Sequence, residues 1–300
     1  MKKRIITAIV AVAYAILIII LTHKNPVFLL LSISAFCAIS VRELVNVIKI
    51  KSKMLKYTSM AYGALVPLLM CFESLYYSFT SVRLSINFRH ILLLLTIAYV
   101  LTMLHSLIKH YEITDFETVA TLILGTICIS MGLSLLPALS QLNYYYPAVF
   151  SKGDAMFIFI YSMVVCWTFD GGAYFIGSKF GKHKMAPVIS PKKSWEGYIG
   201  GIVIGEICCV CYFLLFKHFA AADMKPEMIN VLMIAIMSPI LATASITGDL
   251  SASTIKRNFG VKDFGNFFPG HGGILDRFDS VLYVVPMLYI MVKIIIMVKQ

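Results

Sequence analysis

The chain has 300 residues, of which 59% are hydrophobic and only 14% are charged, and its mean hydropathy is +0.85. A soluble domain cannot bury that much apolar surface, so the composition excludes an ordinary soluble enzyme and predicts an all-α, polytopic integral membrane protein. The net charge of +11 does not indicate nucleic-acid binding, because membrane proteins collect basic residues in the loops of one face.

Apolar segments of the right length recur along the whole chain. A helix that crosses a bilayer needs about 20 mostly apolar residues, because each residue rises about 1.5 Å through a core about 30 Å thick. The second segment contains Arg42 and Glu43 and the third is short, so these two are the weakest. We predict about nine spans, at 5–22, 26–48, 57–73, 90–108, 118–141, 155–178, 197–216, 228–248 and 280–298.

The N-terminus and the basic residues set the expected topology. Lys2, Lys3 and Arg4 before an apolar run resemble a secretory signal, but the run is long and no small-x-small cleavage site follows it. We therefore expect a retained first helix and a cytoplasmic N-terminus. The N-terminus and the inside loops then hold 17 of the 26 Lys and Arg residues, as the positive-inside rule requires. Those loops are 49–56, 109–117, 179–196 and 249–279.

The sixth predicted span carries the polar stretch WTFDGGAYFIG, residues 167–177. Asp170 lies about two turns from its cytoplasmic end. An acid at that depth is costly, so we expect a functional role and a partner. The alternative is a structural acid that pairs with a neighbouring helix. Gly171 and Gly172 would let another backbone or a ligand come close.

The stretch SPKKSWEG, residues 190–197, comes just before the seventh span. Ser194 is predicted to cap a helix that begins at Trp195. Backbone N–H groups at a helix start, with Lys192 and Lys193 beside them, would suit a phosphate. The alternative is an ordinary cap beside a positive-inside flank.

The third polar segment runs from residue 247 to residue 280. Asp249 is expected where the eighth span ends, and Asp276 where the ninth is about to begin. Consecutive helices are usually neighbours, so we expect the two carboxylates to meet at the membrane face and to hold a hard cation such as Mg²⁺. Asp276 and Asp279 would share one helix face.

Glycines and basic residues accompany these acids. In the run PGHGG, residues 269–273, the backbone can approach a ligand without interference from Cβ atoms. The basic residues of the segment are Lys256, Arg257, Lys262 and Arg277. Magnesium held by carboxylates and substrate phosphates and ringed by cations is typical of phosphoryl or nucleotidyl transfer. The sequence has no G-x-S-x-G and no G-x-x-x-x-G-K-[ST], which disfavours acyl transfer and Walker-type ATPases.

The residues from Ser251 to Ser280 resemble the signature of the phosphatidate cytidylyltransferases, or CDP-diacylglycerol synthases. The pattern reads S-x-[apolar]-K-R, four residues, K-D, then P-G-H-G-G, an apolar pair, D-R and D. It is filled by Ser253, Ile255, Lys256, Arg257, Lys262, Asp263, Pro269 to Gly273, Asp276, Arg277 and Asp279. FDGGAYFIG and SPKKSWEG are similar to two upstream motifs of that family. One departure is Ala252, where the family commonly has Glu.

This resemblance implies a reaction in which CTP and phosphatidic acid give CDP-diacylglycerol and pyrophosphate, with Mg²⁺ required and a second cation left open. The phosphatidate oxygen would be the nucleophile, so the main task is to bring two polyanions together. Asp249 and Asp276 are assigned to the metal, with Asp170 nearby. The full catalytic set is Asp170, Asp249, Lys256, Arg257, Lys262, Asp263, His271, Asp276, Arg277 and Asp279. The set assigned to CTP and phosphate is Lys192, Lys193, Ser194, Ser253, Gly272 and Gly273.

Several roles remain open within these sets. The basic residues of the signature would serve the lipid phosphate, the departing pyrophosphate or both. His271 would donate to a phosphate oxygen or orient a metal ligand, or else only brace the glycine loop.

The expected setting is a multi-pass protein of the cell (inner) membrane whose active site faces the cytoplasm. Residues 1–150 would hold about five spans, and residues 151–300 the catalytic region with loops 179–196 and 249–279. The resemblance also implies a homodimer.

Three other functions would use some of the same residues. A polyprenol-type lipid kinase would also use CTP, but the complete signature argues against it. An ion-coupled transporter would use Asp170, Glu206 and Asp249 as sites at mid-membrane. Asp249 and Asp276 are instead expected at span ends, on the face that also holds the basic loops. The CDP-alcohol phosphotransferases require D-G-x-x-A-R, and DGGAY lacks the arginine.

Overall fold

A computed structural model describes residues 2–80, 88–109, 115–270 and 272–299. Within these ranges helices dominate, accompanied by a hairpin of two short strands. The first elements are α1 (Lys2–Lys24), α2 (Val27–Ile48), α3 (Lys53–Met70), α4 (Phe72–Thr80), α5 (Phe88–Lys109), α6 (Phe116–Ser140) and α7 (Leu142–Tyr145). The others are α8 (Lys152–Phe180), β1 (Lys184–Ala186), β2 (Ser190–Ser194), α9 (Trp195–Phe219), η1 (Ala222–Met224), α10 (Val231–Asn258), α11 (Leu275–Phe278) and α12 (Val281–Lys299).

Seven of the described helical segments are long and apolar enough to cross a membrane. They are α2, α5, α6, α8, α9, α10 and the segment Leu275–Lys299, which contains α11 and α12. This confirms the all-α, polytopic membrane class. The predicted spans 5–22 and 57–73 fall on α1 and α3, which are not among the seven, so the count of nine and the cytoplasmic N-terminus stay predictions.

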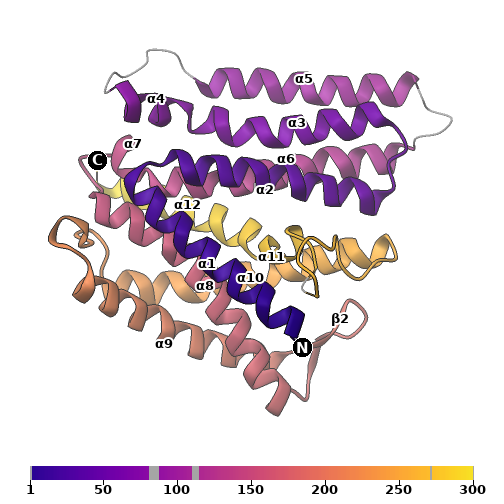
Figure 1. The fold of residues 1–300 in the computed structure, drawn as a ribbon. Coiled ribbons are helices and arrows are strands. Elements are labelled where there is room, and N and C mark those ends of the chain that lie inside the picture. The colour runs from indigo at the N-terminus through magenta and orange to yellow at the C-terminus, as the bar shows by residue number, and fades with distance from the viewer. Residues whose placement is uncertain (1, 81–87, 110–114, 271, 300) are drawn as a thin grey trace. The chain divides into compact units, whose positions relative to one another are not determined.

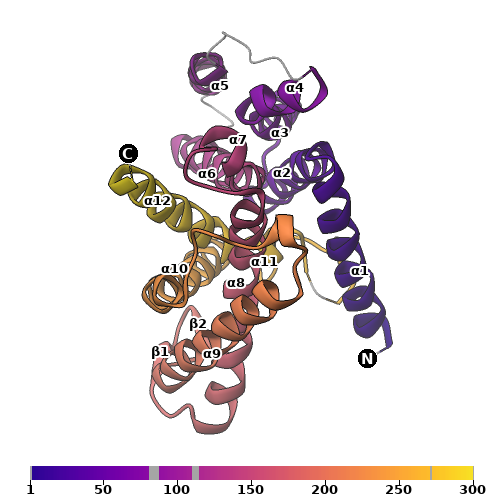
Figure 2. The ribbon, with the colours of Figure 1, turned by 90° about the vertical axis from the view of Figure 1, so that its left-hand side faces the viewer.

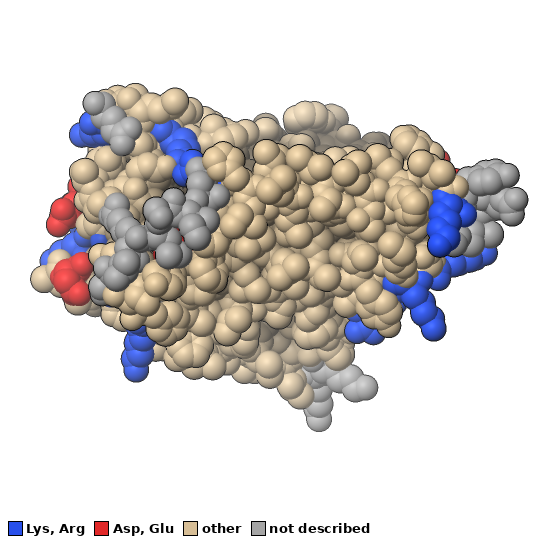
Figure 3. All heavy atoms as spheres, turned by 90° about the horizontal axis from the view of Figure 1, so that it is seen from above, with Lys and Arg blue, Asp and Glu red and all other residues tan. Residues whose placement is uncertain are grey.

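The distribution of charge on one face fits a membrane-spanning helical protein. Figure 3 shows a broad area without charged side chains, with Lys and Arg gathered toward the two ends of the view. Exposed residues of α5 illustrate the apolar surface, since Leu93, Leu94 and Leu101 are all more than half exposed. A helix that buries so little of its apolar surface against protein is suited to contact with lipid.

Contacts divide the chain into two compact units. The N-terminal unit comprises Met1–Ala138 and Phe259–Phe278, and the C-terminal unit comprises Leu139–Asn258 and Asp279–Gln300. The signature segment is therefore shared between the units, because its glycine loop and α11 belong to the first and its last aspartate belongs to the second. The division at residue 150 expected from the sequence stays a prediction.

In the N-terminal unit, α2, α3 and α5 lie side by side (Figure 1). Gly63 of α3 packs against the side chain of Val41 on α2. The rings of Tyr62 and Tyr99 stack with their centroids 4.3 Å apart, which joins α3 to α5. Close packing and hydrogen bonds of this kind hold membrane helices together, because lipid supplies no hydrophobic drive for helices to associate.

In the C-terminal unit, α8 packs against α9 through glycines (Figure 2). Gly197, Gly201 and Gly205 recur every fourth residue and so lie on one face of α9. A Cβ atom on Gly205 would collide with the ring of Phe169 on α8. Gly172 of α8 in turn lies against α9, as predicted for a close backbone approach. This face of small residues lets α8, which carries Asp170, pack closely against α9, which begins within the SPKKSWEG stretch.

The helix ends differ from two predictions. Asp249 was expected at the end of a span, but α10 continues to Asn258. No Gly or Pro occurs between Asp249 and Gly260, so the helix continues beyond Asp249. The φ of +68° at Gly260 is typical of a residue just after a helix. Asp276 and Asp279 do not share a helix face, because α11 ends at Phe278.

Candidate active site

Asp249 forms the centre of a polar cluster in the C-terminal unit. Its Oδ2 atom lies 2.5 Å from Nζ of Lys193, and both side chains are partly exposed. Its Oδ1 atom accepts a 3.4 Å hydrogen bond from the hydroxyl of Ser253, one turn further along α10. The helix spacing thus places Asp249 and Ser253 on one face, and the SPKKSWEG stretch brings a cation to that face.

Two further carboxylates belong to this cluster. The negative charge of Asp249 is close enough to repel the carboxylates of Asp170, on α8, and of Asp279, which directly follows α11. Ser280 connects the same two acids, because its hydroxyl donates to Asp170 at 3.3 Å and its N–H to Asp279 at 2.8 Å. Asp170 therefore has the partner that the sequence predicted. A Cβ atom on Gly248 would collide with the carbonyl oxygen of Asp279, so α10 approaches this turn closely.

Basic side chains balance part of this negative charge. The ammonium group of Lys193 attracts the carboxylate of Asp170 as well as that of Asp249. The ammonium group of Lys256 attracts the carboxylate of Asp279. Lys256 is only 8% exposed, which is uncommon for lysine and requires nearby acids. The unit thus brings together three acids and two lysines from α8, β2, α10 and the turn before α12.

The SPKKSWEG stretch folds as the second strand of a hairpin and the start of α9. β1 and β2 pair antiparallel, with Lys184 opposite Ser194. Ser194 is the N-cap of α9, and its hydroxyl accepts a 3.2 Å hydrogen bond from the N–H of Gly197. The predicted cap is therefore confirmed. The predicted contact of Ser194 with phosphate stays a prediction.

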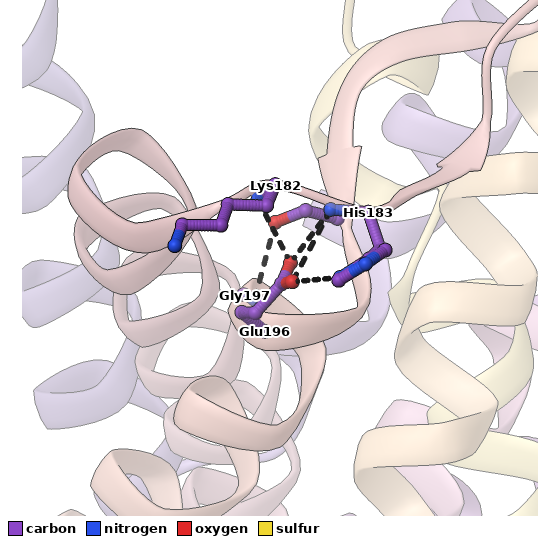
Figure 4. A network of polar contacts seen from close by, with 5 residues as sticks. Lys182, His183, Glu196 and Gly197 are labelled. Atoms are coloured by element: carbon purple, nitrogen blue, oxygen red, sulfur yellow. Dashed lines mark hydrogen bonds and ion pairs between the residues drawn. The ribbon is translucent and has the colours of Figure 1, made fainter.

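A carboxylate at the start of α9 holds the base of this hairpin (Figure 4). Glu196 accepts hydrogen bonds from the N–H groups of Lys182 and His183 at 3.1 and 3.2 Å. One of its oxygens also lies 2.5 Å from Nδ1 of His183. Further out, Nε of Arg257 donates to the carbonyl oxygen of Ile189 at 3.4 Å. The strand that carries Lys192 and Lys193 is thus attached at two points.

The glycine loop of the signature lies in the N-terminal unit, where Asp276 organises it. Oδ2 of Asp276 accepts hydrogen bonds from the N–H groups of Phe264 and Gly273 at 2.8 and 2.9 Å. The Asp276 side chain is 9% exposed. Gly272 has a φ of +84°, and a Cβ atom there would press on this carboxylate. Both conditions favour glycine at that position.

A second carboxylate reaches this loop from α2. The two oxygens of Glu43 accept hydrogen bonds from the N–H groups of Ile274 and Leu275 at 3.1 and 2.9 Å. Glu43 is buried at 7% exposure. Glu43 was not among the predicted site residues and marked only a weak second span, although a charge inside a span is itself a sign of function.

The remaining predicted residues differ in exposure. Lys262, Asp263 and Arg277 are exposed, so they are open to contact by a ligand. His271 lies outside the described residues. Asp249 and Asp276 belong to different units, and their convergence on one ion stays a prediction.

The carboxylates are chemically suited to a hard cation. Among the described residues, no group of three or more His, Cys, Asp or Glu side chains is placed to hold a metal ion. Mg²⁺, however, is usually bound by one or two carboxylates together with substrate phosphates and water. Asp249 already has a cationic ammonium group beside it, so the surroundings accept positive charge.

A family model and a curated protein match nearly the whole of this chain. The model of the cytidylyltransferase family matches residues 2–295. A phosphatidate cytidylyltransferase of Bacillus subtilis (strain 168) is 34% identical over 296 residues, which cover 96% of this chain and 96% of that protein. Enzymes of the same name from Staphylococcus haemolyticus (strain JCSC1435) and Staphylococcus aureus (strain COL) are each 41% identical. The first aligns over 148 residues, or 49% of this chain and 52% of its own length, and the second over 141 residues, or 47% and 51%.

Proposed function

The chain belongs to the cytidylyltransferase family, and we propose that it is a phosphatidate cytidylyltransferase. It is a membrane enzyme that transfers a cytidylyl group from CTP to phosphatidate and so forms CDP-diacylglycerol for phospholipid biosynthesis. The observation that carries this proposal is the similarity over nearly the full length of both chains to a relative of that name. Membership in this family also sets aside the transporter reading.

The reaction joins two anions. An ionised oxygen of the phosphatidate head group forms a bond to the α-phosphorus of CTP, the bond from that phosphorus to the bridging oxygen breaks, and pyrophosphate leaves with the electron pair. Because the nucleophile is already ionised, no side chain has to remove a proton. The repulsion between the reactants is the larger obstacle.

Basic side chains reduce this repulsion. Lys192 and Lys193 lie on a hairpin that is attached at its base and near its tip, and we assign them to the phosphates of CTP. Lys256, Arg257, Lys262 and Arg277 are assigned to the lipid phosphate and the departing pyrophosphate. Fixed cations that face developing negative charge stabilise a transition state without reorganisation.

Asp249 and Asp276 are the proposed ligands of Mg²⁺, with Asp170 and Asp279 as neighbouring acids. When bound, the ion would neutralise phosphate charge and orient the α-phosphate. The support is the hard-oxygen character of these side chains and the ammonium group that Asp249 already accommodates. Lys193 would be released from Asp249 to bind CTP.

The proposed site faces the cytoplasm, where CTP is found, and the protein lies in the cell membrane as a homodimer. The excess of Lys and Arg in loops 179–196 and 249–279 supports this orientation. The diacylglycerol tails would stay in the bilayer while the head group meets the nucleotide at the membrane surface.

The proposal is tested with CTP labelled at two positions. Purified full-length protein in detergent, with phosphatidate and Mg²⁺, should move label from cytidine into a lipid-extractable product and leave γ-phosphate label in water. ATP should not replace CTP. Transfer of the γ-phosphate label into lipid would identify a CTP-dependent lipid kinase instead, and an absence of lipid label would contradict both enzymes.

We expect Glu196→Ala to weaken CTP binding more than it slows the reaction. The change removes the acceptor for Lys182 and His183 at the base of the hairpin, so the strand that carries Lys192 and Lys193 is held less firmly. The KM for CTP should therefore rise about 5- to 10-fold, with a smaller change in kcat. Glu227→Ala, an exposed acid of the same unit, is the control, and an unchanged KM in Glu196→Ala would contradict a role of Glu196 in holding the hairpin for CTP binding.

A further inference from the structure

Glu43 lies inside a predicted membrane span, where a carboxylate is costly. It belongs to α2, whose other buried residues are mostly apolar. Each of its two oxygens accepts one backbone N–H, from Ile274 at 3.1 Å and from Leu275 at 2.9 Å. These donors are more than 230 residues away along the chain. The acid is therefore compensated by the signature segment rather than by its own helix.

Two glycines of the signature segment, Gly265 and Gly273, pack against this carboxylate. A Cβ atom on Gly265 or on Gly273 would come closer than 3.0 Å to the Glu43 carboxyl group. A side chain at either position would displace the Glu43 carboxyl group from its present place. Phe36, two turns earlier on α2, packs against Phe278 with ring centroids 5.5 Å apart, so α11 rests on the same helix.

Glu43 and Asp276 divide the N–H groups of one turn between them. Asp276 accepts from Gly273, and Glu43 accepts from Ile274 and Leu275, which come next in the chain. Asp276 directly follows Leu275. Any displacement of the backbone that Glu43 holds would therefore move the Asp276 carboxylate.

We infer that Glu43 is a positioning residue of the cytidylyltransferase reaction, which holds the Asp276 carboxylate in the orientation that binds the divalent cation. This inference rests on the proposed function and on Asp276 as a metal ligand. It gives the N-terminal half of the chain, which carries none of the signature motifs, a defined part in the active site. Partners that orient a metal ligand typically affect metal affinity or activity by about 10- to 100-fold when removed.

The test measures Mn²⁺ binding to the purified full-length protein by electron paramagnetic resonance, without nucleotide. Glu43→Gln keeps the size of the side chain but leaves only one oxygen to accept two N–H groups. Its Kd for Mn²⁺ should rise about 10-fold or more. Hydrogen exchange should become faster in peptides that cover residues 262–278, and stay unchanged in α8 and α9. Glu117→Gln, an exposed acid of the same unit, should match the wild type in both measurements.

Each other outcome has a definite meaning. A wild-type Kd in Glu43→Gln overturns the inference, even if exchange becomes faster, because Glu43 would then only stabilise the fold. Absence of Mn²⁺ binding by the wild-type protein also overturns it. If Glu43→Gln yields too little folded protein, Glu43→Asp replaces it, since the shorter acid cannot reach both N–H groups, and an unchanged Kd there is equally contradictory.

Failure of this inference and failure of the proposed function are distinguishable. The function fails if the wild-type protein forms no CDP-diacylglycerol from labelled CTP. The role of Glu43 is judged by Mn²⁺ affinity and by exchange, neither of which requires turnover. A second readout follows in the active enzyme, where the Mg²⁺ concentration for half-maximal rate should rise about 10-fold in Glu43→Gln.

Discussion

Asp276→Asn should abolish the formation of CDP-diacylglycerol while the protein remains folded. Asparagine has nearly the same shape and keeps an oxygen that can accept from Phe264 and Gly273, the two N–H donors of Asp276. It lacks the negative charge that a divalent cation needs. A bound metal stabilises transition-state charge by several kcal/mol, and each 1.36 kcal/mol is a factor of ten in rate. We therefore expect kcat to fall at least about 100-fold.

Labelled CTP provides the rate, and thermal unfolding in detergent provides the check on folding. The matched control is Glu117→Gln, which also converts an acid to an amide in the N-terminal unit and should keep the wild-type rate. A wild-type rate in Asp276→Asn would remove Asp276 from the metal site. A large fall in melting temperature would instead assign to Asp276 the loop-bracing role that its two hydrogen bonds also permit.

Asp249→Asn should cause a loss of similar size for a partly different reason. The change removes the second proposed metal ligand and also leaves Lys193 without the carboxylate that lies 2.5 Å from it. We expect kcat to fall at least about 100-fold. Because both side chains of the ion pair are partly exposed, we expect the loss of the pair itself to change the unfolding free energy by less than about 1 kcal/mol.

The control for Asp249 is Asp223→Asn, an exposed acid of the C-terminal unit. High Mg²⁺ gives a further distinction, because a weakened metal site is partly restored by mass action and a misfolded one is not. Full activity of Asp249→Asn at ordinary Mg²⁺ would show that the reaction needs neither metal binding by Asp249 nor its ion pair with Lys193.

Features that depend on neighbouring residues in the chain were predictable from the sequence. The apolar runs identified the membrane class because burial in lipid requires long apolar helices. The cap at Ser194 followed from a serine just before an apolar run, which is a local signal. Gly172 was also predicted as a point of close approach, although its partners on α9 were not.

Features that depend on distant residues were not predictable. The residues near Glu43 in the chain do not show that its carboxylate oxygens accept from the N–H groups of Ile274 and Leu275. These hydrogen bonds form only when the chain folds. The hairpin was missed because its strands are short and lack apolar alternation. Asp249 was placed at a span end because hydropathy falls there, whereas the helix itself continues to Asn258. A fall in hydropathy indicates where a helix leaves the membrane, but the helix itself can continue beyond that point.

The proposed reaction requires Asp249 and Asp276 to bind the same divalent ion. Mn²⁺ titration of the purified wild-type protein, Asp249→Asn and Asp276→Asn, followed by electron paramagnetic resonance, measures this directly. The expected result is one class of bound Mn²⁺ in the wild type that is lost or weakened at least about 10-fold in each single variant. Wild-type Mn²⁺ affinity in either variant would contradict a shared site.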